Sequence, residues 1–246
     1  MLKKLLNRTK NKNTKKDFNQ EVYDSYLNND SLKSSLSRLK RLGVEVSTVI
    51  DVGASNGCWS AVAQTYYSKA KYLLLEAQSE HEKQLQEFSQ KNDNVNYVIA
   101  AASNSDGTIE FDCTDLWGGL AITNEKDSNS LCKQVKSTRI DTCVKNLNLN
   151  GPYLIKLDTH GHELKILEGA GELLRDCNLI IIETYNYKIN NEALKFHETC
   201  YEMEKLGFHC VDISDITYRK KDDTLWQMDL YFVPNRLGFS KYNEFE

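Results

Sequence analysis

The chain has 246 residues, of which 40% are hydrophobic and 27% are charged, so it can bury one substantial core. We expect one domain with an appendage. The longest apolar runs, such as 179–182, are too short to span a bilayer, and the basic start lacks the apolar stretch of a signal peptide. These features exclude a membrane-spanning protein, and we expect no transmembrane segment.

Cysteine usage indicates the redox environment. The seven cysteines are odd in number and scattered, with no pair at Cys-x-x-Cys spacing: Cys58, Cys113, Cys132, Cys143, Cys177, Cys200 and Cys210. Such a set is typical of reduced thiols and not of disulfides or a zinc site. We therefore expect a cytoplasmic protein.

The N-terminal region divides into a basic tail and a helical segment. Residues 1–16 carry seven Lys or Arg and no acid, so the remainder of the chain is acidic. We predict a disordered tail over 1–17, whose charge could attract nucleic acid, an anionic membrane or the acidic body. Over 18–44, four leucines recur at three- and four-residue spacing before Gly43: Leu32, Leu36, Leu39 and Leu42. This pattern predicts a helix that covers a sheet, with no visible chemistry.

The stretch VIDVGASNG at 49–57 predicts a buried strand, a glycine turn and the start of a helix. Gly53 adopts backbone angles that side chains forbid, and Gly57 lets the helix start close to the strand. N–H groups at a helix start can hold a polar or anionic ligand, although an ordinary strand-to-helix connection has the same pattern. The candidate binding residues of this turn are Asp51, Gly53, Ala54, Ser55, Asn56 and Gly57.

The chain then alternates between strand and helix patterns. We predict strands at 71–77 and 95–102 around a helix at 80–90, which gives a parallel sheet with right-handed crossovers. Glu76 ends the second strand roughly 20 residues beyond the glycines, where a nucleotide-binding fold places a carboxylate for the ribose hydroxyls. Ala77 and Ala101 complete the predicted cofactor-binding set. Taken alone, Glu76 would be read as a solvated strand end.

Residues 103–140 interrupt this alternation. Short strands are predicted at 108–113 and 134–140, around a loop rich in Gly, Asn, Asp and Ser that contains Trp117. Such an insertion is typical of a lid or a substrate wall. Trp117 is expected either to stack on a substrate ring or to pin the loop to the core.

The alternation resumes near residue 153. The pattern predicts strands at 153–158, 179–183, 208–213 and 226–233, with helices at 164–174 and 190–206. No long helix separates the last two strands, since only the charged segment 218–223 connects them. We therefore predict that the last strand runs antiparallel to its neighbour.

The turn after the strand at 153–158 carries the candidate catalytic groups. Asp158 ends that strand, and His160 has a pKa range suited to a general base near neutrality. Either histidine of the turn, His160 or His162, could instead be a packed or a solvated ring. His162 and Glu163 could also cap the following helix.

A metal site is a second possibility at the same edge of the sheet. Asp158 and Glu183 end neighbouring strands, and their oxygens could hold a divalent cation such as Mg²⁺ or Mn²⁺.

Six motifs, in this order and spacing, resemble the FkbM-type methyltransferases that use S-adenosylmethionine. They are DVGASNG at 51–57, Glu76, AAASNSDG at 100–107, RIDT at 139–142, LIKLDTHGHE at 154–163 and LEGA at 167–170. The chain departs from the family pattern twice. It has Glu-Ala-Gln at 76–78 in place of Glu-Pro, and Asp-Thr-His-Gly-His-Glu at 158–163 in place of Asp-Val-Glu-Gly-x-Glu.

The resemblance implies an α/β fold with a Rossmann-like seven-stranded methyltransferase sheet, mostly parallel with an antiparallel last strand and helices on both faces. It implies a methyltransferase domain over 45–235, with a lid-like insertion near 103–140 and a C-terminal tail at 236–246. It also implies O-methylation of a hydroxyl on a sugar, glycan or secondary metabolite, with S-adenosylmethionine as cofactor. The expected catalytic residues follow from position and not from the family pattern: Asp158 ends the strand beside the first one, so Asp158 and His160 should face the transferring methyl group at the carboxyl ends of the strands.

Other classes share parts of this pattern. A nicotinamide-dependent oxidoreductase would have the glycine turn and Glu76, but would not require the terminal strand pair. A nucleic-acid methyltransferase should show an Asn-Pro-Pro-Tyr-like run or a Pro-Cys nucleophile, and with only two prolines the chain has neither, so no nucleic-acid partner is expected. A non-catalytic cofactor-binding protein and a homo-oligomer both stay compatible with the sequence.

Overall fold

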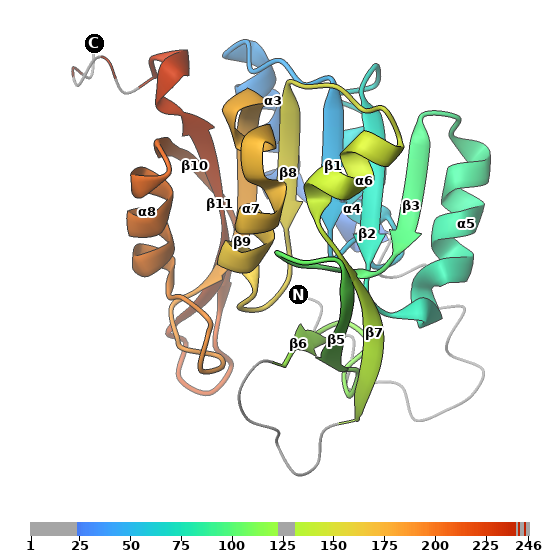
Figure 1. The fold of residues 1–246 in the computed structure, drawn as a ribbon. Helices are drawn as coiled ribbons and strands as arrows, with labels where there is room; N and C mark the ends of the chain where they lie inside the picture. Colours follow the sequence, from blue (N-terminus) through green and yellow to red (C-terminus); the bar gives the residue numbers. More distant parts are fainter. Residues whose placement is uncertain (1–23, 123–130, 240, 242–243, 245–246) are drawn as a thin grey trace.

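The computed structural model describes residues 24–122, 131–239, 241 and 244, so the predicted tail at 1–17 lies outside the described residues. Seven strands form the main sheet in the order β10-β11-β9-β8-β1-β2-β3 (Figure 1). Their bounds are β1 Thr48–Val52, β2 Lys71–Glu76, β3 Val95–Ile99, β8 Tyr153–Leu157, β9 Cys177–Tyr185, β10 Phe208–Tyr218 and β11 Leu225–Pro234. β11 pairs antiparallel with both β9 and β10, whereas β1, β2, β3, β8 and β9 pair in parallel. The predicted sheet with a reversed last strand is confirmed.

Side chains alternate across this sheet and feed two separate cores. Ile50 and Val52 of β1 pack on one side, and Val49 packs on the other. The first core is covered by α6 Ile140–Asn146, α7 Glu163–Ala170 and α8 Phe196–Lys205. The second is covered by α3 Asp30–Arg41, α4 Cys58–Ala63 and α5 Glu82–Lys91. Figure 1 shows α6 and α7 in front of the sheet and α3 and α4 behind it, so helices lie on both faces as predicted.

The N-terminal helix predicted over 18–44 is present only in part: α3 spans Asp30–Arg41, the chain breaks from helix at residues 28–29, and residues 18–23 lie outside the described residues. Asn29 caps it, with its side-chain oxygen accepting from the Leu32 N–H at 3.1 Å. Three of the four predicted leucines are at most 1% exposed: Leu32, Leu36 and Leu39. Leu42 is 53% exposed, because it occupies the C-cap position beyond the buried face. Arg38 joins this helix to β10 through a bidentate ion pair with Asp212, in which its two nitrogens donate at 2.7 and 2.8 Å.

The insertion folds as a second sheet. Its strands are β4 Ala101–Ala102, β5 Gly107–Asp112, β6 Leu120–Ala121 and β7 Cys132–Thr138, in the order β4-β7-β5-β6. Figure 1 shows this sheet beyond the carboxyl ends of the parallel strands. The predicted single strand at 95–102 is therefore wrong, because β3 ends at Ile99 and β4 pairs with β7 of the small sheet.

Three further predicted bounds are corrected. The strand predicted at 134–140 stops at Thr138, because the extended Arg139 serves as the N-cap of α6. The helix predicted at 164–174 ends at Ala170, and residues 171–176 form a 3-10 turn. The helix predicted at 190–206 begins only at Phe196, since the Asn190 side chain accepts from the N–H groups of residues 192 and 193 and holds a turn.

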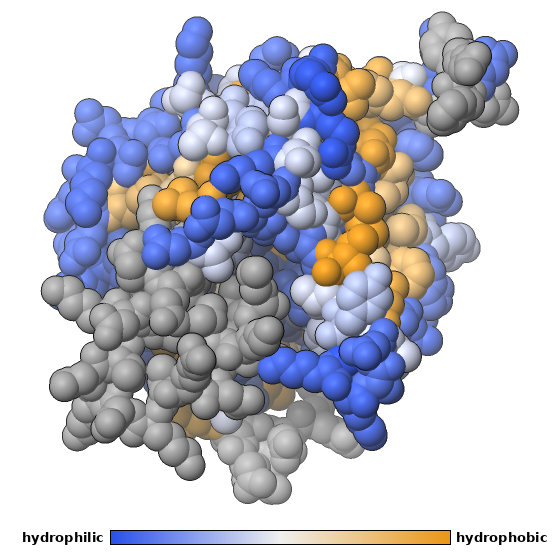
Figure 2. Space-filling view, turned by 180° about the vertical axis from the view of Figure 1, so that it is seen from behind, coloured by the Kyte–Doolittle hydropathy of each residue, from blue (hydrophilic) through white to orange (hydrophobic). Residues whose placement is uncertain are grey.

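The edge strand β10 carries exposed apolar side chains. Ile213, Ile216 and Tyr218 are 42%, 46% and 62% exposed, and Figure 2 shows a hydrophobic band along this side of an otherwise mostly hydrophilic face. An edge strand also presents unpaired backbone groups, so a second copy of the chain would pair here if a homo-oligomer forms. The oligomer stays a prediction. In the described part of the chain, no helix combines the length and hydrophobicity needed to cross a bilayer, and all seven cysteines are free.

The bounds of α3 lead to a truncation prediction. A chain that starts at Asp17 should keep its cooperative thermal unfolding, because the first α3 leucine in the core is Leu32. A chain that starts at Val44 should unfold far more easily, since burying each leucine contributes about 2 to 5 kcal/mol. Circular dichroism melting of both chains against the full length measures this. Loss of cooperative unfolding in the chain that starts at Asp17 would show that the basic tail belongs to the core.

Candidate active site

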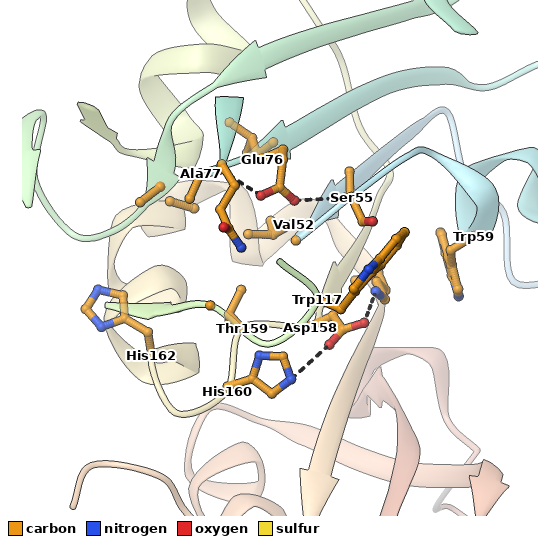
Figure 3. A pocket seen from close by; sticks show the side chains of 18 of the residues that line it. Val52, Ser55, Trp59, Glu76, Ala77, Trp117, Asp158, Thr159, His160 and His162 are labelled. Atoms are coloured by element: carbon orange, nitrogen blue, oxygen red, sulfur yellow. Dashed lines mark hydrogen bonds and ion pairs between the residues drawn. The ribbon is translucent and has the colours of Figure 1, made fainter. Parts of the chain in front are cut away.

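A cavity of about 860 Å³, including its mouth, lies at the carboxyl ends of β1, β2 and β8 (Figure 3). In open parallel sheets this edge is where ligands bind. Its walls contain most of the predicted cofactor-binding residues, namely Gly53, Ala54, Ser55, Asn56, Glu76, Ala77 and Ala101. Both predicted catalytic residues, Asp158 and His160, also line it.

The glycine turn depends on a close approach between β1 and β8. Gly53 has φ +76°, and a Cβ added there would lie 2.2 Å from the Asp158 carbonyl oxygen. The N–H groups of Gly53 and Ala54 both donate to the Leu75 carbonyl, at 3.0 and 3.1 Å. Gly57, at φ +81°, starts α4 with a hypothetical Cβ 3.1 Å from the Phe88 ring, but does not line the cavity. Only glycine at position 53 lets the two strand ends come together.

Glu76 is brought to this turn as the sequence predicts. Its carboxylate is 7% exposed and accepts from the Ser55 N–H and the Gln78 N–H, each at 2.8 Å (Figure 3). Burial raises the pKa of Glu76, and His81 together with these two N–H groups opposes the rise. Each carboxylate oxygen keeps a second lone pair for a ligand hydroxyl. The contact fixes the acid on the cavity wall.

Asp51 does not line the cavity, so its predicted direct contact with a ligand is not supported. It lies on the same side of β1 as Val49, facing α4, and is fully buried. The Ser60 hydroxyl donates to Asp51 Oδ2 at 2.7 Å, and Lys156 Nζ lies 3.9 Å from Oδ1. Burial raises the pKa of Asp51, while Lys156 and Ser60 oppose the rise. Asp51 therefore acts on the cavity indirectly, through its charge interaction with Lys156, which does line it.

Lys156 is a site residue that the sequence analysis did not identify. Its side chain is 3% exposed, and its Nζ lies 2.8 Å from Asp158 Oδ2 and 5.8 Å from the centre of the Trp59 ring. Burial alone would lower the pKa of Lys156, but Asp158 and Asp51 outweigh burial and raise it. In return, Lys156 and then His160 lower the pKa of Asp158 against the effect of burial. The available clue was a lysine inside the otherwise apolar strand YLIKL.

His160 lies between two carboxylates. Its Nε2 is 3.8 Å from Asp158 Oδ1 and 3.5 Å from Glu183 Oε1. Its backbone is in the left-handed region at φ +56°, held there by Asn190, which donates to the His160 carbonyl at 2.6 Å. Burial lowers the pKa of His160, but Glu183 and Asp158 outweigh it and raise it to about 9. The expectation that the pKa of His160 lies near neutrality is therefore corrected. The sequence did not show that Asp158 and Glu183 both lie beside this ring.

Glu183 and His160 complete a possible metal-binding group. Among the described residues, ligand atoms of Asp158, His160 and Glu183 lie within 4.8 Å of one another, so the predicted pair of carboxylates gains a third ligand. Glu183 also accepts hydrogen bonds from the Tyr185 hydroxyl and from Gln227 Nε2, the latter at 2.8 Å. These bonds fix the direction of the carboxylate toward the imidazole.

His162 and Glu163 have structural roles. His162 is 5% exposed, and its Nε2 lies 3.1 Å from the Ser103 hydroxyl. Of the two histidines in this turn, His162 is therefore the packed one. Burial lowers the pKa of His162 to about 4, and its side chain makes no capping bond to α7. The Glu163 carboxylate accepts from the Gly161 N–H at 2.7 Å and from the Thr159 hydroxyl at 3.2 Å. Glu163 therefore shapes the turn that presents His160.

The insertion forms one wall of the cavity. Gln78 Nε2 donates to the carbonyls of Asp115 and Leu116, at 3.0 and 3.1 Å, and His81 Nε2 lies 3.0 Å from the Leu116 carbonyl. The Trp117 ring meets His81 edge-on, with centroids 5.1 Å apart, and also lines the cavity. Trp117 thus pins the insertion and borders the site at the same time.

Tyr26 is a second residue that the sequence analysis did not identify, because it lies in the segment that we predicted to be a chemically silent cover. It lines the cavity from the N-terminal side. Burial raises the pKa of the phenol, the positive charge of Lys156 opposes that rise, and the negative charges of nearby acids add to it. The N-terminal segment therefore contributes a hydroxyl to the charged end of the site.

Comparison with known proteins relates the sequence of this chain to a protein family. The sequence pattern of the methyltransferase FkbM domain matches residues 51–210. The hexuronic acid methyltransferase AglP of Haloferax volcanii is 26% identical over 136 residues, and the match covers 55% of this chain and 54% of that protein, so the chain spans about half the length of this curated relative.

Similar solved structures have TM-scores just below one half. The methyltransferase FkbM structure from Methylobacillus flagellatus KT has a TM-score of 0.48 and 16% identity, covering 76% of this chain and 43% of its own. The fibrillarin pre-rRNA processing protein of Methanococcus jannaschii has a TM-score of 0.49 and 14% identity, covering 76% and 66%. The family pattern matches well over half of the residues of this chain, and the chain therefore belongs to the FkbM methyltransferase domain family.

Proposed function

We propose that this protein transfers a methyl group from S-adenosylmethionine to a hydroxyl of a sugar, glycan or secondary metabolite. The observation that carries the proposal is the hydrogen-bonded pair of Ser55 and Glu76, which lines the same cavity as Asp158 and His160. Family membership supports methyl transfer and disfavours a nicotinamide-dependent oxidoreductase or a non-catalytic binding protein. The name of the archaeal relative supports a sugar acceptor.

The residues of the glycine turn fit the cofactor. The Ser55 hydroxyl is buried without a hydrogen-bond partner among the described residues, and Glu76 offers lone pairs for the two ribose hydroxyls. Ala77 and Ala101 provide small apolar walls beside them for the base. Bound S-adenosylmethionine supplies an electrophilic methyl group on a sulfonium. The protein must then align the acceptor oxygen with that methyl and remove one proton.

We assign proton removal to His160. Glu183 orients the imidazole, and Lys156 keeps Asp158 ionised, so a protonated ring lies between two negative charges. That arrangement stabilises the imidazolium formed when the ring accepts the acceptor's proton. It also means that the resting ring must first lose its own proton, because its pKa is raised to about 9.

A metal-dependent form of the same centre is the second possibility. Asp158 Oδ1 and Glu183 Oε1 both lie within 4 Å of His160 Nε2, at 3.8 and 3.5 Å, so these atoms converge on one point. Mg²⁺ or Mn²⁺ bound there would polarise the acceptor hydroxyl and lower its pKa. Lys156, which already bonds to the second oxygen of Asp158, opposes this form through its positive charge.

The first prediction concerns cofactor affinity. Replacing Glu76 with Ala removes a charge-assisted acceptor, so the affinity for S-adenosylmethionine should fall by about 1.5 to 3 kcal/mol. Titration calorimetry measures this, with Glu87→Ala on the exposed face of α5 as the matched control. Unchanged affinity in the Glu76 variant, or binding of NAD in place of S-adenosylmethionine, would refute the assignment.

The second prediction concerns turnover. His160→Ala should lower kcat by about 10²- to 10⁴-fold, because a general base is removed, while cofactor affinity stays nearly constant. His209→Ala, an exposed histidine on β10, is the control. The release of S-adenosylhomocysteine on the true acceptor measures turnover. If His160→Ala and Asp158→Ala both turn over normally, the chemistry lies elsewhere.

The third prediction concerns pH. The pH dependence of kcat/KM reports groups of the free enzyme, so kcat/KM should rise about tenfold per pH unit and level near pH 9, where His160 loses its proton. Glu183→Gln removes the largest charge that raises this pKa and should move the inflection to lower pH. Exposed Glu172→Gln should leave the profile in place. A flat profile from pH 6 to 9 contradicts the role of His160.

The fourth prediction separates the two forms of the site. If the proton-acceptor form is correct, a chelator such as EDTA should leave activity unchanged. If activity is abolished and then restored by Mg²⁺ or Mn²⁺, the metal form holds, and Asp158→Asn and Glu183→Gln should weaken metal binding in calorimetry. The assay needs only wild-type protein that has been dialysed against the chelator.

A further inference from the structure

The loop that follows β2 holds the insertion against Glu76. Gln78 lies two residues after this acid, is 4% exposed, and bonds to two different parts of the cavity wall. Its backbone N–H donates to Glu76 Oε1 at 2.8 Å. Its side-chain Nε2 donates to the carbonyls of Asp115 and Leu116, at 3.0 and 3.1 Å. One buried residue therefore connects the carboxylate on the cavity wall to the insertion.

The insertion has a glycine where it approaches this side chain. A Cβ added to Gly119 would lie 2.5 Å from a carbon of the Phe111 ring and 2.7 Å from Gln78 Nε2. Real Cβ atoms do not make contacts that short, so a larger residue would force the insertion or its neighbours to shift. Gly119, Gln78 and Trp117 all line the cavity. Close packing and the two donated bonds thus fix one position of the insertion, which we call seated.

A second link between the same loop and the insertion lies at the surface. Lys133 Nζ of β7 lies 2.9 Å from Glu80 Oε1, and both side chains are 45% exposed. An ion pair this exposed contributes little free energy, because water screens it. The buried link through Gln78, in contrast, ends on the acid that we assign to the ribose hydroxyls.

We propose that Gln78 couples cofactor binding to the position of the insertion, so that a ribose bound at Glu76 and the seated insertion stabilise each other. This inference rests on the proposed function and adds a positioning residue to it. Gln78 belongs to the Glu-Ala-Gln segment at 76–78, in which the chain departs from the family pattern. The coupling is therefore expected to be a feature of this chain.

The physical basis of the coupling is the orientation of the Glu76 carboxylate. The Ser55 N–H holds one of its oxygens and the Gln78 N–H holds the other, so the direction of the remaining lone pairs depends on where Gln78 lies. The seated insertion fixes Gln78 by accepting from its side chain. Coupling between two sites is reciprocal, so a ligand that needs the fixed carboxylate must also stabilise the seated insertion.

The first test measures hydrogen exchange. In the wild-type protein, saturating S-adenosylhomocysteine, which carries the same ribose, should slow amide exchange over residues 113–121 by about fivefold or more. Gln78→Met keeps the length of the side chain and removes its donor. Exchange in this variant should be faster without ligand and should no longer respond to it. If the variant responds as the wild type does, the ligand stabilises the insertion without Gln78 and the coupling is refuted.

The second test measures affinity. Gln78→Met should bind S-adenosylhomocysteine more weakly in calorimetry, by the factor with which the ligand slows exchange in the wild type, within about twofold. A side chain that served only stability would lower the melting temperature without this agreement. Gly119→Ala displaces the insertion from its own side and should also weaken binding. The matched control is Glu80→Gln, which removes the exposed link and should change neither affinity nor exchange response.

The outcomes separate the coupling from the proposed function. If the wild-type protein binds neither S-adenosylmethionine nor S-adenosylhomocysteine, the proposed function fails and the coupling fails with it. If the ligand binds and both Gln78→Met and Gly119→Ala keep wild-type affinity and exchange response, the coupling is wrong and the proposed function stands. An equal loss of response in Glu80→Gln would overturn the specific role of Gln78. Should Gln78→Met not fold, Gly119→Ala still tests the coupling.

Discussion

The buried ammonium of Lys156 is the interaction on which the site depends. It lies directly beside Asp51 in the β1–β8 register and bonds to Asp158; Lys156 and Asp51 are buried, whereas Asp158 is 22% exposed at the cavity. Without this charge, a buried and a half-buried carboxylate would lie close together, and at least one would take up a proton. Through Asp51 and Ser60 the same charge is tied to α4, the helix that follows the glycine turn. The glycine turn after β1 and the turn that carries His160 are therefore coupled electrostatically through Lys156.

Backbone geometry also joins these two turns. Gly53 allows β1 to pass within contact distance of the Asp158 carbonyl, and His160 is held at a positive φ by Asn190. Residues other than glycine rarely adopt such angles unless neighbouring contacts hold them there. Here the contact comes from Asn190 after β9, so the conformation of the turn that carries His160 depends on a later segment of the chain.

The proposed reaction would gather positive charge at one end of the cavity. A bound S-adenosylmethionine would bring a positive sulfonium, and the His160 ring is itself protonated at rest because its pKa is raised to about 9. Asp158 and Glu183 flank that ring, with oxygens 3.8 and 3.5 Å from its Nε2. Tyr26, which precedes the family domain in the sequence, lines the same cavity.

The sequence by itself determined most of the strands and the glycine turn between β1 and α4, because β-branched runs, glycines and strand-end acids are local patterns with a local physical cause. The split of residues 95–102 between two sheets and the late start of α8 depended on partners elsewhere in the chain, so periodicity could not show them. The direction of a side chain and the charges around it likewise depend on distant partners, so the sequence pattern could not show them. Only the tertiary structure decided that Asp51 points away from the cavity and that two acids raise the pKa of His160. It also joined α3 to β10, because the ion pair of Arg38 with Asp212 connects residues 174 positions apart and follows from the strand order of the sheet and not from any local pattern.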